Sequence, residues 1–121
     1  MVINLVELIR LYTVDTVDFQ RTDGIWLDGK RIVLRSENVG DIVEARYQSP
    51  YCEARYTLSE ADSEKMMLLL DADEDSLYYR LKEHFEGAAA LDRFKQFCDR
   101  NDMKFKFDFI VNEDEPSEYM F

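Results

Sequence analysis

The chain has 121 residues, of which 26 are acidic and 15 are Lys or Arg, so its net charge is −11. That length suits one domain, and a hydrophobic content of 46% excludes a disordered acidic polymer. The charge argues against direct nucleic-acid binding and against binding to an anionic membrane surface, because both attract Lys and Arg.

The first predicted element is a short N-terminal helix over residues 4–12. Asn4 and Glu7 have the spacing of a capping box. Apolar residues follow at i, i+3, i+4 and i+7, namely Leu5, Leu8, Ile9 and Tyr12. A strand is the competing interpretation, because branched residues flank this run.

Residues 14–58 are predicted to form strands joined by turns. Asp28-Gly29 is a two-residue hairpin signal that pairs Leu27 with Lys30. Alternate apolar residues of this hairpin then share the core face: Ile25, Leu27, Ile32 and Leu34. Trp26 falls on the other face, where it is either a half-exposed binding anchor beside arginines or a residue packed under the first helix.

A four-residue repeat predicts a second hairpin. The sequence EARY occurs at 44–47 and again at 53–56, on either side of a Ser-Pro turn. Folding at this turn pairs Val43 with Tyr56. It also sets Glu44 against Arg55 and Arg46 against Glu53 across the strands. We interpret the charged face as a solvated one that fixes the register.

From Ser59 the pattern is helical until the last strand. Ser59 caps a helix with the sequence EADSEKMMLLL, and a second helix ends at Glu86-Gly87. The second helix has an apolar stripe of Leu77, Tyr78, Leu81 and Phe85. A third runs over 88–100 and is closed by Asn101, and alternation then predicts a strand from Met103 to Val111.

Together these elements predict an α+β fold. It comprises an N-terminal helix, an antiparallel sheet of about five or six strands, and a helical segment before the last strand. We place it in a single domain over residues 1–111. Residues 112–121 are predicted to be an acidic, mobile tail.

No motif in the chain identifies a reaction. We interpret Cys52 and Cys98, which both lie in apolar segments, as buried thiols of a cytoplasmic protein rather than a disulfide. There is no CxxC, HExxH or Gly-rich phosphate loop, and His84 is the only histidine. The N-terminus lacks the features of a signal peptide, and no apolar run is long enough to span a bilayer. We therefore predict no enzyme activity, no metal and no cofactor.

The acidic run DADED at residues 71–75 places carboxylates at positions 1, 3 and 5 of a calcium-loop pattern. That pattern needs Gly at position 6 and Glu at position 12, where this chain has Ser76 and Lys82. Carboxylates are also favoured by the dipole at a helix N-terminus. We interpret the run as the start of the second helix, capped by Asp71 or Asp73.

Two segments carry most of the net charge. Residues 60–75 have seven acidic residues against Lys65, a net of −6, and residues 112–121 have four and no base, a net of −4. One interpretation is a set of solvated helix starts and a soluble tail; the other is a phosphate-like array for a basic cleft. Under the second, the partner-binding residues are Glu60, Asp62, Glu64, Asp71, Asp73, Glu74, Asp75, Glu113, Asp114, Glu115 and Glu118.

With its small size, two acidic clusters and no catalytic motif, the chain resembles the small acidic inhibitors that phages and plasmids use against host defence. The opening MVINLVELIR before strand hairpins is similar to compact α+β anti-CRISPR proteins. This resemblance to anti-CRISPR and anti-restriction proteins implies a non-enzymatic inhibitor. Such a protein occupies the basic surface of a nucleic-acid-processing protein, and binds neither nucleic acid nor membrane itself. The alternative is a cytoplasmic accessory or immunity-type module that binds a protein through apolar contacts around Trp26 or Tyr78-Tyr79.

Overall fold

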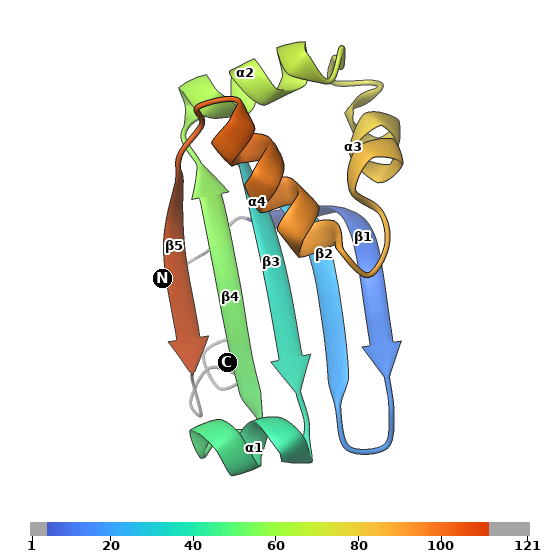
Figure 1. Ribbon diagram of the computed structural model, residues 1–121, viewed down its shortest axis with the longest axis vertical. Coiled ribbons are helices and arrows are strands. Elements are labelled where there is room, and N and C mark those ends of the chain that lie inside the picture. The colour runs from blue at the N-terminus through green and yellow to red at the C-terminus, as the bar shows by residue number, and fades with distance from the viewer. Residues whose placement is uncertain (1–4, 112–121) are drawn as a thin grey trace.

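The structure is a computed structural model that describes residues 5–111. Five antiparallel strands form one sheet in chain order: β1 (Leu5–Asp15), β2 (Gln20–Asp28), β3 (Arg31–Val39), β4 (Tyr51–Leu58) and β5 (Phe105–Val111). Helix α1 (Asp41–Tyr47) joins β3 to β4. Three helices join β4 to β5: α2 (Glu60–Leu69), α3 (Leu77–Phe85) and α4 (Ala90–Arg100). This arrangement confirms the predicted α+β class (Figure 1).

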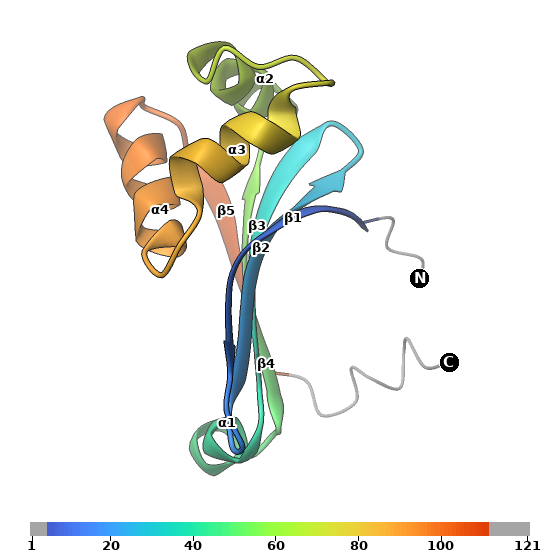
Figure 2. The same ribbon diagram turned by 90° about the vertical axis from the view of Figure 1, so that its right-hand side faces the viewer.

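The helices are distributed unequally about the sheet. Seen edge-on, α3 and α4 lie on one face, α2 lies across one end and α1 lies at the other end (Figure 2). None of the four described helices lies on the opposite face. Among residues 5–111, no helix is both long enough and apolar enough to cross a bilayer.

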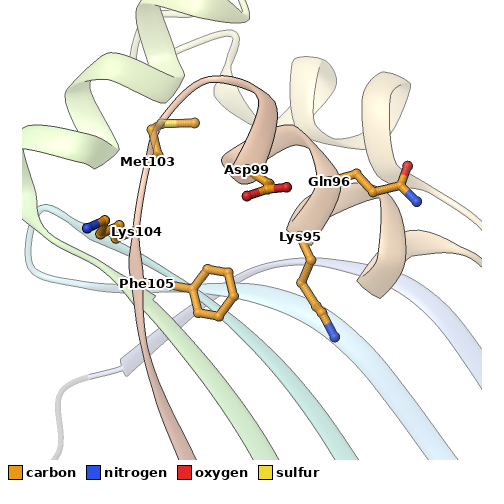
Figure 3. A pocket seen from close by; sticks show the side chains of 6 residues that line it. All are labelled: Lys95, Gln96, Asp99, Met103, Lys104 and Phe105. Carbon is orange, nitrogen blue, oxygen red and sulfur yellow. The ribbon is translucent and has the colours of Figure 1, made fainter.

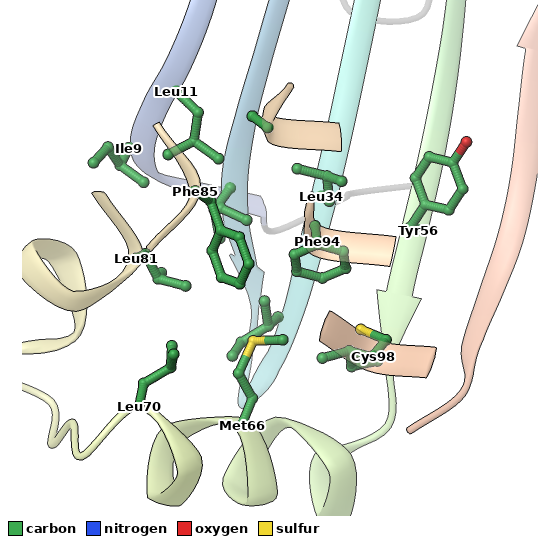
Figure 4. Close-up of a cluster of buried hydrophobic side chains, with 14 of the residues drawn as sticks. Ile9, Leu11, Leu34, Tyr56, Met66, Leu70, Leu81, Phe85, Phe94 and Cys98 are labelled. Carbon is green, nitrogen blue, oxygen red and sulfur yellow. The ribbon is translucent and has the colours of Figure 1, made fainter. Parts of the chain in front are cut away.

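The main hydrophobic core lies between the sheet and the helices (Figure 4). Phe85 of α3 and Phe94 of α4 have ring centroids 5.6 Å apart, and both side chains are buried. They pack with Leu34 of β3 and Met66 of α2, neither of which is exposed to solvent. Apolar residues of the sheet and of all three helices therefore meet in one core that holds the helices on the sheet.

The predicted N-terminal helix over residues 4–12 is wrong, because the described part of it belongs to β1. Ile9 and Leu11 of this strand are buried in the core. The register with β2 shifts between Glu7 and Ile9, and again between Arg10 and Tyr12. Such shifts break the two-residue alternation of a strand, so the apolar residues fall at a spacing that also fits a helix.

The first predicted hairpin exists, but its turn is displaced by one residue. Asp28 pairs with Arg31, so the two loop residues are Gly29 and Lys30 rather than Asp28 and Gly29. Pairing Leu27 with Ile32 in place of Lys30 moves the register by two residues on one strand. Because side chains alternate with a period of two, the core face is unchanged, and the predicted face sharing is confirmed.

The second predicted hairpin is wrong. Residues 44–47 belong to helix α1, whereas the identical residues 53–56 belong to β4. Strand β4 pairs instead with β3, so that Glu53 lies opposite Glu37 and Arg55 opposite Arg35. Only Val43 of α1 is buried, so little packing opposes the helical conformation there.

The helical region agrees with prediction except at the start of the second helix. Helix α3 begins after Ser76, so the prediction that residues 71–75 start it is wrong; they lie in the turns before it, where the Asp73 side chain bonds the N–H groups of Asp75 and Ser76. Ser59 caps α2, Glu86 ends α3 and Asn101 ends α4. The Asn101 side chain donates a 2.8 Å hydrogen bond to the Phe97 carbonyl, which stabilises that end. Cys52 and Cys98 are buried free thiols, as expected. The predicted mobile tail at 112–121 lies outside the described residues.

Candidate protein-binding site

Helix α2 and the loop after it place the predicted acidic residues of segment 60–75 at one end of the sheet (Figure 1). At the start of α2, the Ser59 hydroxyl accepts a 3.1 Å hydrogen bond from the Asp62 N–H. One turn on, the buried Ser63 hydroxyl accepts a 2.9 Å hydrogen bond from the Ile32 N–H. This contact fixes α2 above the start of β3.

Two charged residues of α2 connect it to the end of α4 and the start of β5. The Asp62 carboxylate accepts a 3.3 Å hydrogen bond from the Lys104 N–H, and the Lys65 amine donates a 2.6 Å bond to the Asn101 carbonyl. Burial, assisted by the nearby Asp62 carboxylate, raises the pKa of the Cys98 thiol to about 12. Asp62 therefore has a structural role, and the only base of residues 60–75 is engaged with the chain.

The loop between α2 and α3 is organised by one aspartate. The Asp73 carboxylate accepts hydrogen bonds from the Ser76 N–H at 2.8 Å and the Asp75 N–H at 3.0 Å. These bonds, led by that from Ser76, lower the pKa of Asp73. Asp71 has a left-handed φ of 55° and lies 4.0 Å from the Arg80 guanidinium. Within the described residues, no group of three or more His, Cys, Asp or Glu is arranged to hold a metal ion.

Three other predicted glutamates line one pocket of about 540 Å³ between α2, the following loop and strands β1 to β3. Glu60 and Glu64 come from α2 and Glu74 from the loop, and all three side chains are exposed. The apolar lining consists of Leu8, Leu27, Ile32, Met67 and Leu77. Lys30 of the β2–β3 turn is the only base in the lining. A pocket of this composition suits a ligand that combines cationic and apolar groups.

The structure thus separates the predicted binding residues. It gathers Glu60, Glu64 and Glu74, and gives Asp62 and Asp73 internal partners. Asp71 and Asp75 are exposed on the loop outside the pocket lining. The four predicted tail residues lie outside the described residues: Glu113, Asp114, Glu115 and Glu118.

The structure treats differently the two apolar surfaces that the sequence offered as alternative protein-binding sites, one around Trp26 and one around Tyr78-Tyr79. Trp26 is 7% exposed, so it is not a half-exposed anchor, and no helix packs over it at the N-terminus. Gly24 lies directly beside its ring, where an added Cβ would come within 2.8 Å of the indole. Tyr78 and Tyr79 of α3 are 39% and 70% exposed, with ring centroids 5.1 Å apart. They remain available for contact with a protein.

A buried charge cluster on the helix-free face was not predicted. Glu53 has no solvent exposure and accepts two 2.8 Å hydrogen bonds from Arg35 and one from Arg55. Tyr51 also donates to Glu53. Burial alone would raise the pKa of Glu53, but the hydrogen bonds from Arg35 and Tyr51 lower it overall. The signal was the alternation of charges in β3 and β4, which becomes visible only once those strands are paired.

A second pocket, of about 520 Å³, lies between α4 and the start of β5 (Figure 3). Its lining includes Lys95 and Asp99 of α4, and Lys104 and Phe105 at the start of β5. The Lys95 amine lies 5.6 Å from the centre of the Tyr56 ring. With two lysines and one aspartate among its lining residues, this region is not part of the acidic surface.

Comparisons of the chain with protein-family models, curated proteins and solved structures give no match.

Proposed function

We propose that this chain is a non-enzymatic cytoplasmic protein that inhibits a nucleic-acid-processing protein, such as a CRISPR or restriction nuclease, by occupying its basic surface. The observation that carries the proposal is the convergence of Glu60, Glu64 and Glu74 around one apolar pocket. Two free buried thiols support the cytoplasmic part, because such thiols are typical of a reducing compartment.

The pocket glutamates differ from ordinary solvated acids. Within the described residues they take part in no side-chain hydrogen bond or ion pair. Glu60 and Glu64 are also one helical turn apart, an arrangement that mildly destabilises a helix. The helix dipole favours Glu60 in the first turn of α2 but leaves its repulsion with Glu64, which a cationic partner would remove.

The chemistry of the pocket suits the side chains that bind phosphates. Arg and Lys have apolar stems that can lie on the floor of the pocket while their charged ends meet the carboxylates. A basic groove engaged in this way could not hold its nucleic acid at the same time. Because charge guides the encounter, association should be fast at low salt and slower at high salt.

The test is a comparison of two triple variants of the full chain. Glu60→Lys, Glu64→Lys and Glu74→Lys reverse the pocket charges, whereas Asp15→Lys, Asp41→Lys and Glu44→Lys make the same charge change with exposed residues at the opposite end. Each protein is used to capture partners from lysate at low and high salt, with and without competing duplex DNA. We expect the pocket variant to lose at least about tenfold in capture of a DNA-competed protein, and the control to keep it.

Equal loss in both variants would indicate a general charge effect, and unchanged capture by the pocket variant would contradict the proposal. Thermal unfolding of each variant shows whether the fold is retained.

Exposed apolar residues favour a second candidate, an accessory module that recognises a protein without imitating nucleic acid. Tyr78 and Tyr79 on α3 are 39% and 70% exposed, and their ring centroids are 5.1 Å apart. Aromatic side chains exposed together on a surface are typical of protein-binding sites. This candidate predicts capture that resists high salt and is lost in Tyr78→Ser with Tyr79→Ala, but not in the glutamate variant.

A further inference from the structure

Strand β5 forms one edge of the sheet. Strand order places β5 at the edge beside β4, and no other described strand pairs with it. Phe107, Phe109 and Val111 are 51%, 46% and 40% exposed. A regular edge strand with exposed aromatic residues is a template for another strand, because its outer backbone groups have no partner in the sheet.

The opposite edge, formed by β1, is different. Its pairing with β2 is interrupted by two register shifts. The Leu11 carbonyl of β1 also accepts a 2.9 Å hydrogen bond from the Gly87 N–H, which comes from the connection between α3 and α4. Register shifts and covering segments are the usual means by which an edge is protected from further pairing. The β5 pairing with β4 is continuous over seven residue pairs.

The sequence of β5 is complementary to itself in one antiparallel register. Phe107 lies beside the buried Tyr56, so it belongs to the helical face, and its neighbours Lys106 and Asp108 belong to the other face. A twofold axis through Phe107 sets Lys106 of each copy opposite Asp108 of the other. Centring the pair on Asp108 would instead oppose two carboxylates, which is unfavourable.

We propose that a second copy of this chain pairs with β5, antiparallel and centred on Phe107, so that two five-stranded sheets form one continuous ten-stranded sheet. Phe107 meets its counterpart, and Phe105 of each copy lies opposite Phe109 of the other. Both aromatic contacts lie on the helical face, and the two Lys106–Asp108 pairs lie on the other face.

The distribution of charge permits this association despite a net charge of −11 per chain. Strand β5 has one lysine and one aspartate and is therefore neutral. Beside it, Lys95 and Lys104 line the pocket between α4 and β5. The acidic segment 60–75 lies on α2 and the next loop, at the end of the sheet where β5 begins, so antiparallel copies carry their acidic segments at opposite ends of the paired strands.

The test is sedimentation velocity of the full chain over a wide range of concentration. We expect a species of twice the 14.4 kDa chain mass at high concentration. Lys106→Glu and Asp108→Lys should each weaken association by at least about tenfold, because each opposes like charges. An equimolar mixture of the two variants should associate again, because unlike charges then face each other in the mixed dimer. This rescue would show that the charges at 106 and 108 of one copy face those of the other.

Phe107→Lys gives a second disruption, and Val6→Lys is its matched control because Val6 is an exposed apolar residue on β1. We expect the first variant to be monomeric and the control to associate like the original chain. Unfolding curves confirm that each variant is folded, which matters most for Asp108→Lys because Asp108 lies opposite Arg55. A monomer at every concentration, a dimer unaffected by Phe107→Lys, or a mixture that stays monomeric would overturn the proposal.

Discussion

The two faces of the sheet bury their side chains by different means. On the helical face, Leu34 of β3 packs under Phe94 of α4, and neither is exposed. On the other face, adjacent in the same strand, Arg35 donates two hydrogen bonds to Glu53, which is equally buried. Leu34 and Arg35 are thus neighbours in β3, but the first belongs to an apolar cluster and the second to an ionic one.

The difference follows from what covers each face. Where helices supply apolar side chains, the sheet supplies apolar partners. The helical face also has an ion pair where the sheet extends beyond α4: the Arg21 guanidinium lies 2.8 Å from the buried Asp23 carboxylate. A long arginine can cover a carboxylate and its neighbours while its own end remains near water. The sheet therefore uses arginine–carboxylate pairs where no described helix lies over it.

The largest effect is expected from the apolar face. Phe94→Ala removes a fully buried ring between α4 and the sheet, and should reduce the free energy of unfolding by about 3–5 kcal/mol. Urea denaturation measures this loss. Phe97→Ala on the same helix is the control, because Phe97 is only partly buried and should cost less. Equal losses would mean that α4 is held by its whole length rather than by Phe94.

The stability of the fold should be nearly as sensitive to a substitution on the ionic face, even one that keeps the size of the side chain. Glu53→Gln leaves two arginines without their shared carboxylate, and should cost about 3 kcal/mol in urea denaturation at neutral pH. Glu37→Gln is the control. Its carboxylate lies 3.4 Å from Arg35 and is 30% exposed, so the loss should be below about 1 kcal/mol. A loss for Glu53→Gln no larger than the control's would show that the cluster contributes little to stability.

The success of sequence prediction also divides between local and non-local features. The caps at Ser59 and Asn101 are local signals, and the helices they delimit are where the sequence places them. The EARY repeat shows the limit: residues 44–47 are exposed and helical, whereas residues 53–56 lie between β3 and β5 and are extended. Pairing with two distant strands decides the second conformation, and four residues cannot encode that.

The candidate site shows the same division. The glutamates at 60, 64 and 74 were predicted from the density of charge alone. Their pocket also needs Leu8 of β1 and Lys30 of the β2–β3 turn, which reach it only through the fold. The Glu53 cluster was missed for a related reason, because its arginines come from both β3 and β4.

Lowering the pH should weaken the contribution of the ionic face to stability but not that of the apolar face. Hydrogen bonds to Glu53 lower its pKa from an ordinary value of 4.5. The stabilisation from its charged form is therefore present above that value and is lost as the pH falls through the lower pKa of the folded state. The difference in unfolding free energy between the original chain and Glu53→Gln should shrink from pH 7 to pH 3. The difference for Phe94→Ala should not change, and a parallel decline in both would contradict this contrast.

The smallest expected effect concerns how the ionic face covers Trp26. The Arg35 guanidinium lies 4.7 Å from the centre of the indole, so Arg35 both holds Glu53 and covers the ring. Arg35→Lys keeps the charge but removes the planar group that makes both contacts, and should cost about 1 kcal/mol. Because Trp26 is the only tryptophan, its fluorescence emission should shift to the red as water reaches the ring.

Arg55→Lys is the control, because Arg55 also contacts Glu53 whereas the guanidinium over the Trp26 ring is that of Arg35. A shift confined to Arg35→Lys would assign the cover of Trp26 to that one side chain, whereas equal shifts would assign it to the cluster as a whole.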